Sequence, residues 1–159
     1  MALAFLLFGS ALHAEEPLWT DNYKEAAVRA QAEGKAMLLD FTGSDWCPWC
    51  MRMHKEALDK PSFKDYARKN LVLVEVDFPN HKPQPARVQA QNEHLAKQYG
   101  VDEFPTLILV SKRGKVLDRF GYTPGGPGAL IAEIQRHYHG PAGGKLAAAA
   151  GDTRKPVQS

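Results

Sequence analysis

The segment AMLLDFTGSDWCPWC, residues 36–50, joins a short apolar run to a pair of cysteines. Cys47 and Cys50 are the only two cysteines in the 159-residue sequence, and two residues separate them. The apolar run predicts a strand over 36–41, and the residues that follow Cys50 are good helix formers. Two cysteines with this spacing at a strand-to-helix junction indicate a redox-active dithiol.

Strands and helices alternate along the rest of the chain. The apolar periodicity predicts helices over 19–33, from the cysteines to 58, and over 62–69, 86–99 and 129–138. Strands are predicted over 36–41, 71–78, 106–110 and 116–120, and a tight turn at 112–115 joins the last two. This order predicts an α/β fold whose mixed sheet ends in an antiparallel hairpin.

The composition is that of an ordinary globular domain. Apolar residues make up 44% of the chain and charged residues 24%, and the length predicts one domain with a substantial core. The net charge is only +2, and the basic residues are scattered among acids along the predicted helices. Since the sequence has no dense basic patch with interleaved aromatic residues, we expect no nucleic-acid partner.

The first fourteen residues differ from the rest of the chain. Residues 2–12 are almost entirely apolar, and Ala14 is followed by two glutamates and a proline. The run is about half of the ~20 residues that a membrane span needs, so it predicts a signal peptide over 1–14 that is cleaved after Ala14. We then expect export without stable membrane insertion. No Lys or Arg precedes the run, and a buried N-terminal helix is the alternative.

The last twenty residues also stand apart. Residues 140–159 consist mostly of Gly, Pro, Ala, Lys and polar residues without periodicity. Because such a segment cannot bury enough apolar surface to order itself, it predicts a flexible C-terminal tail. The folded domain is therefore expected to span residues 15–139.

Two further motifs accompany the cysteine pair at characteristic separations. Trp46-Cys47-x-x-Cys50 follows a strand that ends in Asp40-Phe41, Phe104-Pro105-Thr106 precedes the strand at 106–110, and Gly121 closes the last strand. Together these motifs resemble the thioredoxin superfamily over roughly residues 19–138. The resemblance implies a thioredoxin-like, three-layer α/β/α fold. It is strongest to the secreted bacterial thioredoxin-like proteins, which implies a periplasmic or secreted location.

The two cysteines are expected to play different parts. Cys47 stands at the first turn of a predicted helix, where free backbone N–H groups and the helix dipole favour thiolate over thiol. Such motifs lower a cysteine pKa from ~8.5 to between ~3.5 and ~7.5, so Cys47 is the expected nucleophile. Cys50 is expected to attack the mixed disulfide and release the substrate. Pro48 rigidifies the turn without removing a hydrogen bond, since the first helical N–H has no partner.

The resemblance implies a role for Asp40. It corresponds to the buried acid that thioredoxins place beneath the cysteine pair, where it moves a proton to or from Cys50. One extra residue separates Asp40 from the first cysteine in this chain. A purely structural role is therefore the alternative.

The resemblance also implies a substrate-binding surface. Pro105 matches the cis-proline of the family, whose preceding peptide faces the cysteines and offers backbone hydrogen bonds to an extended substrate. Phe104 would line a substrate groove. The residues expected to contact substrate are Trp46, Pro48, Trp49, Phe104 and Pro105.

These features predict a thiol–disulfide oxidoreductase that acts on protein disulfides through Cys47 and Cys50, without an organic cofactor or metal. The resemblance implies client proteins that carry disulfides or dithiols, a redox partner that recycles the pair, and a monomeric enzyme. The dipeptide Pro48-Trp49 is neither the Gly-Pro of thioredoxin nor the Gly-His of protein disulfide isomerase, and this dipeptide tunes the potential. The body of the chain favours reduction or isomerisation over oxidation.

Two alternatives of other classes remain open. Cys47, Cys50, Met51 and His54 share one helical face, and thiolate with thioether suits Cu(I), which would make the protein a copper-binding or metal-delivery protein. The same spacing is also that of an amphipathic helix on a sheet. A substrate-holding module without turnover is the other alternative. The segment 78–92 is longer than its thioredoxin counterpart, and it is either an added binding surface or a harmless insertion.

Overall fold

The computed structural model describes residues 17–141. Its elements in chain order are β1 (Trp19–Thr20), α1 (Tyr23–Glu33), β2 (Ala36–Thr42), α2 (Pro48–Met53), the π-helix η1 (His54–Leu58), α3 (Pro61–Asn70), β3 (Leu71–Asp77), α4 (Ala86–Tyr99), β4 (Thr106–Val110), β5 (Val116–Phe120) and α5 (Gly126–Gln135). This alternation of strands and helices, closed by a hairpin, confirms the predicted α/β fold.

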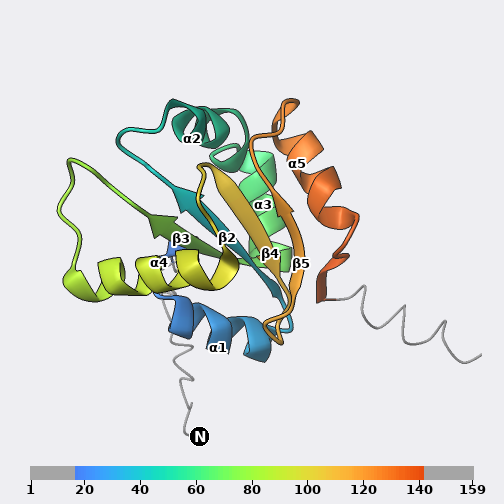
Figure 1. Cartoon of the computed structure of the whole chain (residues 1–159). Coiled ribbons are helices and arrows are strands. Elements are labelled where there is room, and N and C mark those ends of the chain that lie inside the picture. The colour runs from blue at the N-terminus through green and yellow to red at the C-terminus, as the bar shows by residue number, and fades with distance from the viewer. Residues whose placement is uncertain (1–16, 142–159) are drawn as a thin grey trace, which may run out of the picture.

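A five-stranded mixed sheet with the order β1-β3-β2-β4-β5 forms the middle layer (Figure 1). The central strand β2 pairs in parallel with β3 and antiparallel with β4. β4 and β5 form the predicted antiparallel hairpin at one edge. All seven residues of β2 are buried, so the strand that leads to the cysteine pair is held from both sides and both faces.

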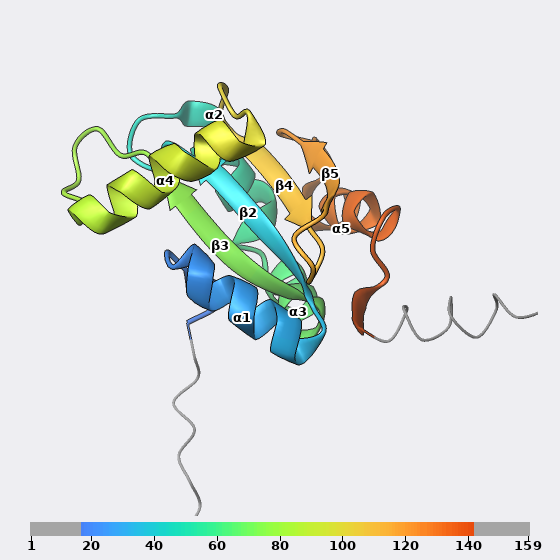
Figure 2. The same cartoon turned by 60° about the horizontal axis from the view of Figure 1, so that its bottom comes forward.

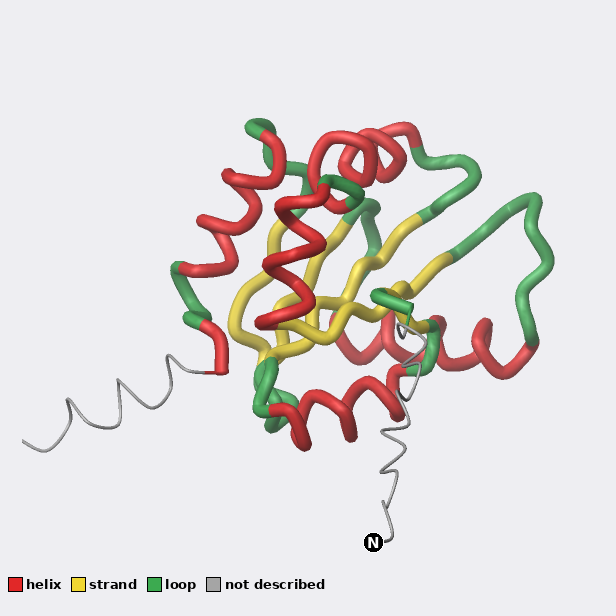
Figure 3. Tube along the Cα trace, turned by 180° about the vertical axis from the view of Figure 1, so that it is seen from behind, coloured by secondary structure: helices red, strands yellow, loops and turns green. Residues whose placement is uncertain are grey.

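Helices cover both faces of the sheet. α1 and α4 cover the face that carries Met37, Leu39 and Phe41 (Figure 2). α2, η1, α3 and α5 cover the opposite face, seen from behind in Figure 3, which carries Leu38. Side chains alternate between the faces along a strand, so Asp40 lies on the same face as Leu38. Its carboxyl group therefore points toward the layer that contains the cysteine helix.

The start of the described chain differs from the expectation. Trp19 and Thr20 form β1, which pairs with β3, rather than the first turn of a helix. Asn22 caps α1, and its Oδ1 accepts the backbone N–H of Glu25. A strand of two residues is too short to produce a periodic signal, and its pairing with β3 is a long-range contact.

Two helices also differ in their ends or type. α5 begins at Gly126, earlier than the predicted residue 129, because Pro127 is tolerated in the first helical turn. The predicted helix through residue 58 widens into the π-helix η1, in which the N–H of Asp59 donates to the carbonyl of His54 over 2.9 Å. This wider turn lies directly after α2.

The predicted signal peptide over 1–14 lies outside the described residues, and so do residues 142–159 of the predicted tail. No helix within residues 17–141 has the length and apolar character needed to cross a membrane.

Candidate active site

The cysteine pair lies at the N-terminus of α2. Cys47 is the N-cap residue of this helix, and Pro48 is its first residue. A disulfide joins Cys47 to Cys50, with their Cα atoms 5.3 Å apart. The N–H of Cys50 donates to Sγ of Cys47 over 3.2 Å. This N–H and the positive end of the helix dipole would stabilise a Cys47 thiolate once the disulfide is reduced.

Trp46 forms one rim of this site through contacts with two other segments. Its Nε1–H donates to the carbonyl oxygen of Phe78 over 2.7 Å, and its ring meets that of Phe104 edge-on, with centroids 5.9 Å apart. Gly43 leaves room for the indole, since a Cβ at this position would clash with it. Trp46 is 39% exposed, so it presents apolar surface beside the disulfide.

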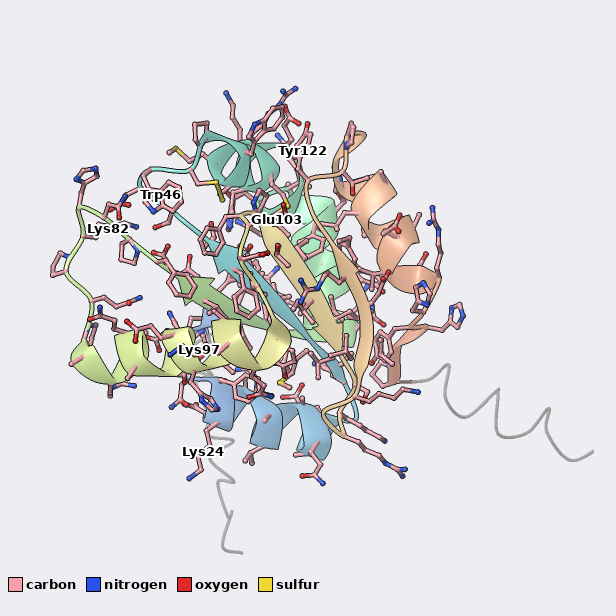
Figure 4. The ribbon with its side chains drawn as sticks, in the orientation of Figure 1. Lys24, Trp46, Lys82, Lys97, Glu103 and Tyr122 are labelled. Atoms are coloured by element: carbon pink, nitrogen blue, oxygen red, sulfur yellow. A yellow bond between two sulfur atoms is a disulfide. The ribbon has the colours of Figure 1, made fainter. Side chains whose placement is uncertain are left out.

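An aromatic and charged cluster forms the other rim, where Figure 4 shows Tyr122 across α2 from Trp46. The rings of Trp49 and Tyr122 lie 5.1 Å apart, and the Arg52 guanidinium lies 5.3 Å and 5.4 Å from their centroids. Glu56 accepts hydrogen bonds from Tyr122 Oη over 2.5 Å and from Arg52 Nε over 2.8 Å. These bonds, first that of Tyr122, lower the pKa of Glu56. The cluster fixes Trp49 while leaving it half exposed.

Pro105 lies at the start of β4, and the Phe104–Pro105 peptide is cis, as the motif predicts. The next residue, Thr106, pairs with Phe41 of β2. Its Oγ1 donates to the carbonyl oxygen of Glu103 over 2.8 Å and so holds the turn closed. Because Phe104 touches Trp46, this turn and the disulfide lie at the same end of the sheet.

Asp40 is fully buried in β2 and binds a histidine. Its Oδ2 lies 2.7 Å from Nε2 of His54, the first residue of η1. The N–H of His54 donates to the carbonyl of Cys50, so these two residues lie one helical turn apart. Burial raises the pKa of Asp40. Burial alone lowers the pKa of His54, but the hydrogen bond and charge of Asp40 outweigh it, and the pKa of the imidazole is raised.

A cavity of about 280 Å³ reaches the inner side of the disulfide. Cys50, His54 and Glu75 line it together with Thr42, Ser44 and Met51. Glu75 pairs with Asp40 across β2 and β3. Burial, followed by the charges of Asp77 and Asp40, raises the pKa of Glu75. Several titratable groups therefore share the space beneath Cys50.

The segment after β3, which the sequence suggested is an insertion, is tied to the loop that precedes the cysteines. Asp45 accepts three backbone N–H groups, those of residues 80, 81 and 82, over 2.9, 2.7 and 2.9 Å. Asp77 accepts the N–H and the hydroxyl of Ser44 over 2.9 and 2.5 Å. Figure 4 shows Lys82 of this segment on the same side of the molecule as Trp46. The insertion thus forms part of the surface around the site.

The copper alternative gains no support from these contacts. Cys47 is bonded to Cys50, Met51 is 45% exposed, and His54 directs Nε2 to Asp40. Over residues 17–141, no group of three or more His, Cys, Asp or Glu side chains is arranged to hold a metal ion.

Sequence reasoning missed three features of the site. The partner of Asp40 is His54, which the sequence suggested only as a copper ligand. Tyr122, which packs against Trp49, belongs to no motif of the sequence. Asp45 also belongs to none, and its only signal in the sequence is its position next to Trp46.

Comparisons with known proteins agree with this geometry. A family model described as a thioredoxin-like domain matches residues 23–131. The chain is 39% identical over 115 residues to the disulfide bond reductase DsbH of Chlamydia pneumoniae. These aligned residues make up 72% of this chain and 69% of that protein. It is 33% identical over 104 residues to the thioredoxin-related protein DsbJ of the same organism, which covers 65% of this chain but only 30% of that protein.

The solved structure of a DsbH oxidoreductase superimposes with a TM-score of 0.72 at 36% identity, covering 85% of this chain and 94% of that chain. The predicted three-layer thioredoxin-like fold is thereby confirmed. Since the family model spans more than half of the sequence and the site has the matching cysteine geometry, the chain belongs to the thioredoxin-like family.

Proposed function

We propose that this chain is a protein-disulfide reductase whose reactive group is the Cys47–Cys50 pair. The predicted protein-disulfide oxidoreductase activity is confirmed by homology to a disulfide bond reductase over most of that protein's length. The observation that carries the proposal is the disulfide between the chain's two cysteines at the N-cap of α2. The name of that relative also supports reduction over isomerisation.

The reaction proceeds by two thiol–disulfide exchanges. The Cys47 thiolate attacks one sulfur of a client disulfide, the client S–S bond breaks, and the first client sulfur leaves as a thiolate. Cys50 then loses its proton to Asp40 and attacks Sγ of Cys47, which releases the second client sulfur. The client gains two electrons, and the Cys47–Cys50 pair loses two. The exchange needs no organic cofactor or metal, because sulfur carries all the electrons.

An extended client segment binds across the rims described above. The exposed rings of Trp46 and Trp49 support apolar contacts on either side of the disulfide. Phe104 backs Trp46, and the peptide before Pro105 supplies backbone hydrogen bonds. Pro48 contacts the client next to Cys47. The clients are therefore unfolded or flexible proteins that expose a disulfide beside apolar residues.

The cycle also requires a redox partner that reduces the Cys47–Cys50 disulfide again. A homologue named for disulfide reduction supports such a partner in general terms. We place the enzyme in the periplasm or outside the cell because residues 1–14 have the pattern of a signal peptide. The resemblance to the thioredoxin superfamily supports a monomer. The catalytic domain then spans 15–139, and 140–159 forms the tail.

Insulin reduction by dithiothreitol, followed as turbidity, tests the proposal. The wild-type protein is expected to accelerate precipitation, and Cys47→Ser is expected to leave only the uncatalysed rate. Cys50→Ser should accumulate a mixed disulfide between Cys47 and the insulin chain. Val28→Ser, at an exposed position, is the control. Unchanged acceleration by Cys47→Ser would contradict the proposal and favour the substrate-holding alternative.

A further inference from the structure

Asp40 cannot exchange a proton with bulk solvent by itself, because its side chain is fully buried in the central strand. In the proposed reaction it accepts the proton of Cys50 once per cycle. Oxidation of the pair releases this proton and reduction of the disulfide takes one up again, so a route that exchanges protons between the buried carboxyl group and solvent would serve both half-reactions. The contacts of Asp40 show where this route lies.

His54 connects Asp40 to the surface. Its Nε2 lies 2.7 Å from Oδ2 of Asp40, and its Nδ1 lies 3.7 Å from Oδ1 of Asp59. The three side chains are 0%, 23% and 55% exposed in the order Asp40, His54, Asp59. An imidazole can bind a proton at one nitrogen and release one from the other, so this geometry suits proton transfer.

A cavity lies between Cys50 and the histidine that binds Asp40. Cys50 and His54 both line this space, whose volume of about 280 Å³ is large enough for water. Thr42 also lines it. Among the described residues, Oγ1 of Thr42 has no hydrogen-bond partner, and neither has Oδ1 of Asp40, which lies two residues earlier on the same face of the strand. Buried polar atoms usually bond to protein or water, so these oxygens favour a hydrated route.

The charges around His54 favour the imidazolium form. Asp40 faces it from β2, Glu75 from β3 and Asp59 from the end of η1, while the ring of Trp19 in β1 packs 5.8 Å away. Beyond this group, Asp77 raises and Lys82 lowers the pKa of Glu75 through their charges. Three acids therefore raise the pKa of His54 by their charges, and the imidazolium in turn stabilises the ionised form of Asp40.

We propose that His54 is a positioning residue for the second exchange: it orients the Asp40 carboxylate and passes to solvent the proton that leaves Cys50. The inference rests on the proposed function. The S–H bond of Cys50 breaks, its electron pair forms the bond to Sγ of Cys47, and its proton goes to Asp40. His54 then releases its Nδ1 proton toward Asp59 and solvent. One proton enters the Asp40–His54 pair and one leaves it, and reduction of the disulfide reverses the path.

The two exchanges can be followed separately when the disulfide reagent dithiobis(nitrobenzoate) is added to the reduced protein in an equimolar amount. Attack by Cys47 releases the first thionitrobenzoate, and attack by Cys50 on the resulting mixed disulfide releases the second at a rate independent of concentration. We expect His54→Gln to slow the second release about tenfold near pH 7 and to move the midpoint of its pH profile up by about one unit. The first release should change less than twofold. His94→Gln, at an exposed position of α4, is the control.

The dependence on Asp40 is tested with a double variant. Asp40→Asn/His54→Gln removes the buried carboxylate that His54→Gln leaves without a partner, so we expect it to fold even if the single variant does not. We expect its second release to be no slower than that of Asp40→Asn alone, because His54 acts through Asp40. An unchanged second release in His54→Gln, an equal slowing of both releases, or a further slowing in the double variant would each overturn the inference. A wild-type protein that releases no second thionitrobenzoate would instead refute the proposed function.

Discussion

At the scale of single residues, His54 makes the stability of the protein depend on pH. The hydrogen bond and charge of Asp40 raise the pKa of His54 above its ordinary value of 6.5, against the effect of burial. A group whose folded-state pKa is raised contributes stability that is complete below the unfolded pKa and is lost as the pH rises through the folded pKa. Each unit by which the pKa of His54 is raised corresponds to about 1.4 kcal/mol of the free energy of unfolding.

We therefore predict that the free energy of unfolding of the oxidised protein falls as the pH rises above about 6.5. Urea denaturation of wild type and His54→Gln from about pH 6 to about pH 9 measures this contribution. The difference in stability between the two proteins should shrink toward alkaline pH. His94→Gln should follow the wild-type curve. A difference that stays constant or grows over this range would contradict the account.

The residues of the site differ in how far sequence alone could place them. The spacing of Cys47 and Cys50 at a strand-to-helix junction predicted a redox pair at the start of a helix, and the resemblance to the thioredoxin superfamily implied the cis peptide before Pro105. The contact between Asp40 and His54 joins a strand to the helix packed above it. Such a partner depends on the packing distance between two elements, which no spacing in the sequence reveals.

At the scale of elements, the insertion after β3 depends on Asp45. Its carboxylate accepts three successive backbone N–H groups, and these bonds, first that of Asn80, lower the pKa of Asp45. A lowered folded-state pKa means that this anchoring is present above the unfolded pKa of about 3.9 and is lost as the pH falls through the folded value. The segment around residues 79–85 should therefore loosen in acid.

We predict that Asp45→Ala increases the rate of subtilisin cleavage within residues 79–85 at neutral pH severalfold, because the segment loses its three anchoring bonds. Mass spectrometry of the fragments locates the cut. Asp102→Ala, at an exposed acidic position, should be cleaved like wild type. Equal cleavage of the Asp45 variant and wild type would show that these bonds do not hold the segment.

Elements with strong periodicity could be predicted, and those without it could not. β2 and β3 are apolar runs of seven residues each, and both were found within one residue of their true ends. β1 has only two residues. η1 differs from an α-helix only in that its backbone N–H donates to the carbonyl five residues earlier instead of four. Neither leaves a compositional trace, because long-range pairing creates the first and packing of the helix on the sheet accompanies the second.

For the whole molecule, the core beneath the cysteine helix sets the stability. Phe63 of α3 is fully buried in this core with Leu38, Leu73 and Leu109 of the sheet. We predict that Phe63→Ala lowers the free energy of unfolding by about 3–5 kcal/mol, because it removes a large buried side chain and leaves a cavity. Urea denaturation measures the loss. Val28→Ala, at a position 64% exposed, should change stability by less than about 0.5 kcal/mol, and a similarly small loss for Phe63→Ala would be inconsistent with this packing.

Fold class followed from the order of strands and helices, whereas the order of strands within the sheet did not. β1 is first in sequence but pairs with β3, and β2 lies at the centre between β3 and β4. These neighbours are separated by helices in the chain, so only the assembled sheet reveals that Asp40 stands opposite Glu75 beneath the disulfide.

If the Cys47–Cys50 pair donates electrons to protein disulfides, its reduction potential must be low. We would measure this potential by equilibrating the protein in a series of glutathione and dithiothreitol buffers and quantifying the oxidised fraction by thiol alkylation. We expect a value close to that of thioredoxin, about −270 mV. A value near that of a strong thiol oxidant, about −120 mV, would show that the pair does not act as a reductant.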